Sequence, residues 1–172
     1  MDDFNTAAII AREGPLTKTE ACMESTTDRR LATAISAVAS ACIVTRSVQA
    51  RLGAIEHHSK SDSSPVTVAD YAAQAVIASY MSEHLDEFIL VGEEDAHTLR
   101  KPENEDLAAS VLTAVRNVWD NANSEDALDA IDLGNHDASA RSYWTLDPID
   151  GTKGFLRGGQ YAISLALIED GE

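Results

Sequence analysis

Two aspartates lie three positions apart in the stretch LDPIDGTKGF, residues 146–155. Asp147 and Asp150 are expected to repel each other unless a cation lies between them. A hard cation such as Mg²⁺ binds carboxylate and carbonyl oxygens, and the carbonyl of Ile149 would be well placed as a further ligand. The spacing indicates a metal site, but Asp, Pro and Gly also form ordinary turns, and the residues alone leave both interpretations open.

The residues that follow could bind a phosphate group. Gly151 allows close approach of the backbone, and a helix that begins near Thr152 would point free N–H groups and its positive dipole end at an anion. Metal ligands beside a phosphate cradle suit metal-assisted hydrolysis of a phosphate ester. Lys153 and Arg157 could hold a substrate phosphate or could only offset the acidic surface.

Other candidate residues are scattered along the chain. The acids of the GEED stretch, residues 92–95, could contribute to a metal site or form a solvated group of charges. Asp70 is expected near the first turn of a helix, where an acid is compatible with the helix dipole. The histidines share no ligand-like spacing and are expected at the surface, whereas the tryptophans are expected in the core. These residues are His57, His58, His84, His97, His136, Trp119 and Trp144.

Periodicity and capping signals predict the elements that must position these residues. A first amphipathic helix is expected from Thr27 and Asp28 to about Ala50, and a second from about Thr67. The stripe of the first helix that should face the core consists of Leu31, Ile35, Val38 and Cys42. A polar loop is expected between the two helices, over about residues 57–66.

The second half of the chain is expected to combine short strands with helices. Strands are predicted at 88–91, 141–147 and 161–168, and helices at about 107–118 and 124–133. Ser124 should cap the last of these helices and Gly134 should end it. Asp170 and Gly171 signal a hairpin turn. The chain is therefore expected to be of the α+β class, with a loosely ordered extension over 1–27 and one domain over 28–172.

Composition limits the function classes. The chain has 172 residues, 44% of them hydrophobic, and 29 acidic against 13 basic residues give a formal net charge of −16. Such a charge argues against binding to a nucleic acid polymer or to an anionic membrane. We expect no transmembrane helix, no leader and a cytoplasmic location, because Asp2, Asp3 and Glu13 do not suit a targeting peptide. Cys22 and Cys42 should be free thiols.

Three stretches together resemble the lithium-sensitive, magnesium-dependent phosphomonoesterase superfamily that includes inositol monophosphatase and fructose-1,6-bisphosphatase. They are SKSDSSPVTVADYAAQAV (59–76), VGEED (91–95) and YWTLDPIDGTKGFLRGGQYAISLALIEDG (143–171), in the family's order. The string DPIDGTKGFLRG is highly specific, and its KGFLR part is most similar to the 3'(2'),5'-bisphosphate nucleotidase branch. The resemblance covers the chain from about residue 30 onward.

This resemblance implies a reaction and roles for individual residues. The implied Mg²⁺ ligands are Glu93, Asp147, the carbonyl of Ile149, and Asp150. Asp70 and Thr152 would position and deprotonate the attacking water, and the amides of Gly151 and Thr152 would bind the scissile phosphate. The implied substrate is a small phosphorylated nucleotide, adenosine 3',5'-bisphosphate, which would lose its 3'-phosphate to give AMP. Related sulfated nucleotides of sulfur assimilation are further candidate substrates.

The chain also departs from the family. Members are usually about twice this long, and their second half supplies a Trp-Asp motif that completes the metal site and most of the nucleotide pocket. We therefore expect only the N-terminal α+β part of the family's layered α/β/α/β/α sandwich, with the C-terminal domain absent. Two other interpretations stay open: an inositol polyphosphate phosphatase, and a catalytically incompetent truncated fragment that at most binds metal or a partner.

Overall fold

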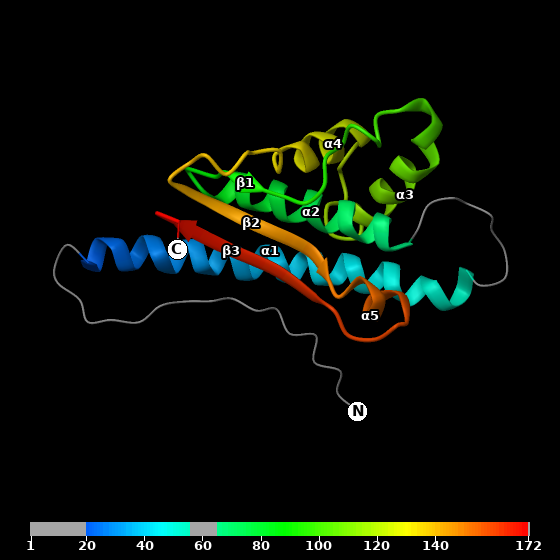
Figure 1. Ribbon diagram of the computed structural model, residues 1–172, viewed down its shortest axis with the longest axis horizontal. Coiled ribbons are helices and arrows are strands. Elements are labelled where there is room, and N and C mark those ends of the chain that lie inside the picture. The colour runs from blue at the N-terminus through cyan, green and yellow to red at the C-terminus, as the bar shows by residue number, and fades with distance from the viewer. Residues whose placement is uncertain (1–19, 56–64, 172) are drawn as a thin grey trace.

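The computed structural model describes the backbone of residues 20–55 and 65–171, and the side chains of residues 29–52 and 67–171. Helices alternate with the strands of one small sheet along the chain, which confirms the expected mixture of α and β structure (Figure 1). The elements are α1 (Glu20–Ile55), α2 (Pro65–His84), β1 (Leu90–Val91), the 3₁₀ helix η1 (Pro102–Asn104), α3 (Glu105–Val115), α4 (Ser124–Asp132), β2 (Ser142–Asp150), α5 (Thr152–Leu156) and β3 (Ala162–Glu169).

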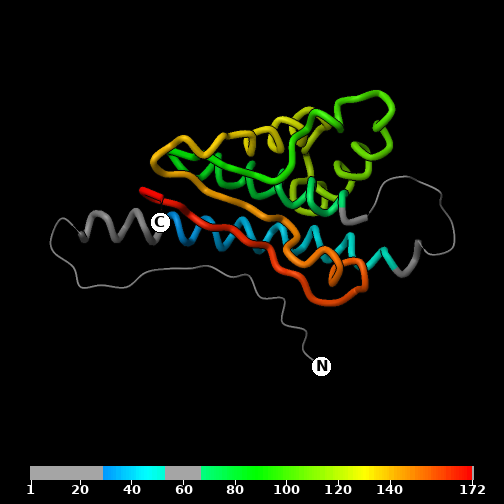
Figure 2. Tube along the Cα trace, in the orientation of Figure 1, coloured from blue at the N-terminus to red at the C-terminus, as the bar shows by residue number. Residues whose placement is uncertain are grey.

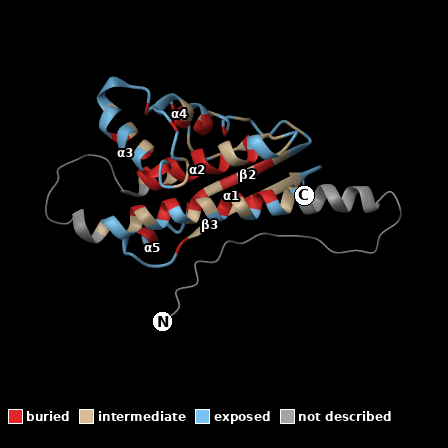
Figure 3. Ribbon diagram, turned by 180° about the vertical axis from the view of Figure 1, so that it is seen from behind, coloured by how far each residue is buried: buried red, intermediate tan, exposed pale blue. Residues whose placement is uncertain are grey.

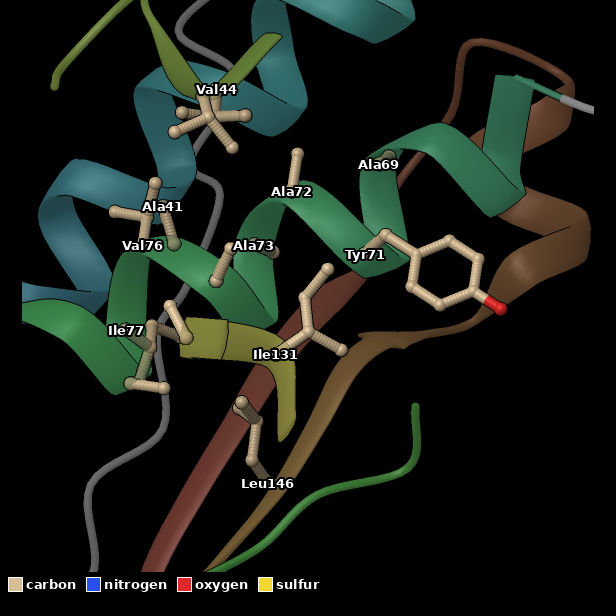
Figure 4. Close-up of a cluster of buried hydrophobic side chains, with 14 of the residues drawn as sticks. Ala41, Val44, Ala69, Tyr71, Ala72, Ala73, Val76, Ile77, Ile131 and Leu146 are labelled. Atoms are coloured by element: carbon tan, nitrogen blue, oxygen red, sulfur yellow. The ribbon is translucent and has the colours of Figure 1, made fainter. Parts of the chain in front are cut away.

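Helix α1 buries a different face from the one expected. Val38 is buried, but Ile35 is 50% exposed and Cys42 is only partly buried. The buried face consists of Thr33, Ala34, Ala37, Val38, Ala41, Val44, Thr45 and Val48. Helix α2 is also rich in buried alanine, and small side chains on both helices allow their axes to approach closely (Figure 4). The expected stripe is wrong at Ile35 because close packing favours the small side chains over the large one.

The segment Arg29–Leu52 of α1 is long and apolar enough to cross a membrane by length and composition alone. The sequence-based expectation of no such segment therefore does not hold for α1. A buried core helix can have the same length and apolar composition, and 44% of the most apolar 18-residue stretch of α1 is buried inside the structure. The packing of α1 against α2 and β3 is sufficient to explain its apolar composition.

Several element boundaries differ from those expected. Helix α1 begins at Glu20, so residues 20–27 are helical rather than part of an extension; residues 1–19 and 56–64 lie outside the described residues. Extension of an existing helix is favourable even without periodic apolar residues. Asn123, not Ser124, caps α4, in a reciprocal capping box with Asp126. Helix α2 begins at Pro65, so Asp70 lies in its second turn rather than its first.

The sheet has the order β1-β2-β3, with β1 parallel and β3 antiparallel to β2. Helices α1 and α2 cover one face of it, as the views from the two sides agree (Figures 1 and 3). The buried residues facing these helices are Leu90, Trp144, Leu146, Ile163 and Leu165. The other face, called the open face below, carries the partly exposed residues Val91, Thr145, Asp147, Ser164 and Ala166. Trp144 is a core residue as expected, and Trp119 packs against the core.

The 172-residue chain is expected to self-associate through β3. This strand pairs only with β2 within the described residues, and its other edge is free to template pairing with a second chain. Ala166→Lys places a charge in the middle of β3 and should shift the chain toward monomer in size-exclusion chromatography with light scattering. Ala109→Lys, on the exposed surface of α3, is the matched control and should change nothing. A wild-type chain that is monomeric at micromolar concentration would contradict the expectation.

Candidate functional site

The parallel pairing of β1 with β2 brings two acids together. Leu90 pairs with Trp144 and Val91 with Thr145. Continuing this register by two residues places Glu93 beside Asp147 at the ends of the two strands. The carboxyl groups of Glu93 and Asp147 therefore lie close enough to act on each other. Burial and this contact raise the pKa of Glu93.

A β-bulge determines which way Asp150 points. Asp147 pairs with Ser164 and Asp150 pairs with Ala162, so β2 contains one more residue than β3 between these pairs. The two residues of β2 between these pairs are Pro148, which has no N–H for the ladder, and Ile149. Ser164 and Ala162 share a face, so their partners do as well, whereas residues three apart in a regular strand face opposite sides. The bulge thus allows two aspartates at this spacing to serve one site.

Asp70 faces the same group of acids from helix α2. Burial raises its pKa to about 7, and the charge of Glu94 adds to the effect. Glu93 and Asp147 raise the pKa further, so acids from three separate segments act on one another. We call Asp70, Glu93, Glu94 and Asp147 the acid cluster. A cation would relieve the repulsion within it.

Tyr71 and Glu94 belong to the site but were not identified as a pair from the sequence. In Figure 4 the ring of Tyr71 extends away from the labelled alanines and valines of the core. Its hydroxyl donates a hydrogen bond to the carboxylate of Glu94. Burial and the charge of Glu94 raise the pKa of Tyr71 to about 12. The two residues lie 23 positions apart in the numbering, and no periodic signal connects them.

The turn after Asp150 has the geometry that a glycine provides. Gly151 has φ +100°, a left-handed conformation that other residues rarely adopt. Its carbonyl accepts hydrogen bonds from the amides of Gly154 (2.7 Å) and Phe155 (3.1 Å), which begins α5 as expected near Thr152. The first amides of a helix have no partner within the helix. The turn thus presents amides where a phosphate was expected to bind.

Two side chains of α1 hold the segment between β2 and β3, which Figure 2 shows beside the later turns of this helix. The Nε2 atom of Gln49 donates to the carbonyl oxygens of Phe155 and Gly159, at 3.1 Å each. The hydroxyls of Thr45 and Tyr161 are 2.7 Å apart in the core. A long core helix therefore fixes the loop that carries Thr152.

The expected site residues are only partly assembled. Asp150 and Thr152 are exposed and follow Asp147 of the acid cluster by three and five residues. The Thr152 hydroxyl donates to the Ile149 carbonyl at 3.4 Å. Within the described residues no hydrogen bond joins Thr152 to Asp70, and Lys153 and Arg157 are exposed without an ion pair. Described histidines lie elsewhere: His84 stacks on Tyr80, His97 is exposed, and His136 pairs with Asp137.

The acid cluster suits a hard cation in its donor chemistry. No three Asp, Glu, His or Cys side chains among the described residues lie close enough to form a metal cage. Magnesium does not need one, because it is usually bound by one or two carboxylates and keeps several waters. The neighbouring carboxyls of Glu93 and Asp147 provide such a pair, and the Ile149 carbonyl provides a further oxygen two residues from Asp147.

The stability of the metal-free chain is expected to fall as the pH rises through the range set by Asp70. Its carboxyl has an ordinary pKa of 3.8 and a folded-state pKa of about 7. Between these values the folded chain binds more protons than the unfolded chain, so the free energy of unfolding decreases with rising pH and then levels off. Thermal melts from pH 4 to pH 8 should show this slope, and Asp70→Asn should flatten it. An equal slope in wild type and variant would contradict the assignment.

Comparisons with known proteins agree on one family. The sequence profile of the inositol monophosphatase family matches residues 26–172. The chain is 40% identical to 3'(2'),5'-bisphosphate nucleotidase 1 of Arabidopsis thaliana over 156 residues, which cover 84% of this chain and 44% of the relative. It is 41% identical over 142 residues to the 3'(2'),5'-bisphosphate nucleotidase of Dictyostelium discoideum, covering 80% of this chain and 42% of the relative. The chain thus spans less than half of the length of these curated relatives.

Proposed function

This chain belongs to the inositol monophosphatase family. We propose that it forms the N-terminal part of a magnesium-dependent 3'(2'),5'-bisphosphate nucleotidase. The reaction is the removal of the 3'-phosphate from adenosine 3',5'-bisphosphate, which gives AMP and inorganic phosphate. The observation that carries this proposal is the contact of Glu93 with Asp147 directly before the bulge and the Gly151 turn. The names of the relatives support the choice of a nucleotide substrate.

Each residue of the site has a role in this proposal. Glu93, Asp147, the carbonyl of Ile149, and Asp150 hold Mg²⁺, whose chemistry is to polarise the phosphate and to make bound water a better nucleophile. The Thr152 hydroxyl orients the attacking water, and Asp70 accepts its proton. The amides of Gly151 and Thr152 donate to the phosphate oxygens. The water oxygen bonds to phosphorus as its proton passes to Asp70, and the bond to the 3'-oxygen breaks. That oxygen takes a proton from solvent, and Asp70 returns its proton to solvent.

The proposed architecture is the N-terminal part of a layered α/β/α/β/α sandwich. The described sheet is covered by helices on one face, and its open face and free β3 edge are where further layers would attach. We place the protein in the cytoplasm, with the small nucleotide as partner and no nucleic acid polymer or membrane. The formal net charge of −16 supports the exclusion of polyanionic partners.

The experiment compares phosphate release from two substrates. One sample is the 172-residue chain, and the other is this chain continued by the C-terminal half of the Arabidopsis relative, called the completed chain below. Adenosine 3',5'-bisphosphate should be hydrolysed by the completed chain only when Mg²⁺ is present. Preferential hydrolysis of inositol polyphosphates would instead indicate an inositol polyphosphate phosphatase. A completed chain that folds but is inactive on both substrates would indicate that the protein is catalytically incompetent.

A further inference from the structure

Gln74 is a fully buried polar residue of α2 with no role so far. It lies four residues after Asp70, so the two side chains share one face of the helix. Its Nε2 atom donates to the carbonyl oxygens of Glu94 (2.6 Å) and Ile131 (2.9 Å), and its Oε1 atom accepts from the amide of Glu94 (3.1 Å). One side-chain amide thus binds both backbone groups of a residue in the acid cluster.

Two glycines make room for this side chain. A Cβ atom placed on Gly134 would lie 2.5 Å from Nε2 of Gln74, and one placed on Gly92 would collide with the Gln74 amide as well. The amide of Gly92 donates to the carbonyl of Gly134 at 2.8 Å. Gln74 therefore occupies a slot between two close backbone segments, one leading into the acid turn and one leaving α4.

The slot fixes the backbone on both sides of Glu93. Gly92, the preceding residue, is bonded to Gly134, and Glu94, the following residue, is bonded to Gln74. The side chain of Glu93 is itself exposed and interacts with the neighbouring acids, Asp147 first among them. Its position relative to Asp70 therefore depends on the backbone of the turn. Gln74 joins this backbone to α2, and the Tyr71 hydroxyl of the same helix bonds the side chain of Glu94.

We propose that Gln74 is a positioning residue of the metal site, which sets the place of Glu93 relative to Asp70 and Asp147 and thereby the affinity for a divalent cation. The proposal rests on the proposed function, because that function assigns Glu93 to the metal. A merely structural role would also satisfy the buried backbone groups of Glu94 and Ile131, but it would affect stability alone.

The test measures Mn²⁺ binding to the 172-residue chain through the electron paramagnetic resonance signal of the free ion. Gln74→Met fills the slot but removes all three hydrogen bonds. We expect binding about 10- to 100-fold weaker than in wild type, as is typical when a partner behind a metal ligand is removed. Val111→Ala, a buried α3 position outside the acid cluster, is the control. It should lower the melting temperature and leave Mn²⁺ affinity unchanged.

Amide hydrogen exchange provides a second readout that needs no metal. The amide of Glu94 should be protected in wild type and exposed in Gln74→Met, while the core of α2 stays protected. If the methionine variant does not fold, Gln74→Glu carries the test, because it keeps the size and an acceptor for the Glu94 amide but can donate at most one of the two hydrogen bonds of Nε2. Its affinity for Mn²⁺ should be lower than that of wild type.

The outcomes separate the two proposals. Wild-type Mn²⁺ affinity in a folded Gln74 variant whose Glu94 amide has lost protection would overturn the positioning role alone. Equal weakening in the Val111→Ala control would assign the effect to lost stability and would also overturn it. A wild-type chain that binds no Mn²⁺ would instead overturn the metal assignment of the proposed function, and the positioning role would fall with it.

Discussion

Asp150→Asn is expected to abolish the magnesium-dependent phosphatase activity of the completed chain and to leave its fold intact. A neutral amide cannot replace a charged carboxylate as a magnesium ligand at small cost, because Mg²⁺ prefers anionic oxygens in a strict octahedral arrangement. The fold should tolerate the change, since Asp150 is exposed at the end of β2 and its side chain makes no hydrogen bond within the described residues. If Asp150 were only a turn residue, asparagine would substitute for it well.

The measurement is phosphate release from adenosine 3',5'-bisphosphate over a range of Mg²⁺ concentrations, with circular dichroism to verify the fold. Asp120→Asn removes one exposed acid outside the acid cluster and serves as the control for net charge. In the 172-residue chain, Asp150→Asn should also weaken Mn²⁺ binding. Near wild-type turnover in the Asp150→Asn variant would refute its assignment to the metal.

The sequence was sufficient to single out candidate acids for the site but not the reason for their spacing. Asp147, Asp150 and Gly151 stand out because their types and order suit a cation beside a phosphate. Whether two residues three apart share a face depends on pairing with β3, which is a contact across the sheet and leaves no local pattern. The bulge beside Pro148 could be suspected only from the missing N–H of proline.

Tertiary contacts explain the other differences between expectation and structure. Ile35 was expected in the core from its hydrophobicity, yet close packing of alanines buries the neighbouring face of α1. Gln74 looks like an ordinary polar position in a helix, because its partners Glu94 and Ile131 come from distant segments. Helix periodicity reports which face is apolar, and it does not report which small or polar side chains a neighbour requires.

Thr152→Ala and Asp70→Asn are each expected to lower the turnover number of the completed chain by about 10²- to 10⁴-fold, the usual contribution of general acid–base catalysis. If the Thr152 hydroxyl and the Asp70 carboxylate orient and deprotonate the water, their loss acts on the transition state and changes KM little. In the structure the Thr152 hydroxyl donates to the Ile149 carbonyl at 3.4 Å, and within the described residues no hydrogen bond joins it to Asp70. We therefore expect the hydroxyl to turn toward the water once metal and substrate are bound.

Steady-state kinetics with adenosine 3',5'-bisphosphate at saturating Mg²⁺ would separate kcat from KM. Thr152→Ser keeps the hydroxyl and should retain most of the turnover, whereas Thr113→Ala removes an exposed hydroxyl of α3 and should have no effect. A raised KM with unchanged kcat would assign Thr152 and Asp70 to substrate binding. Loss of activity in Thr152→Ser equal to that in Thr152→Ala would also contradict the proposed role, because the difference between serine and alanine at this position is the hydroxyl that orients the water.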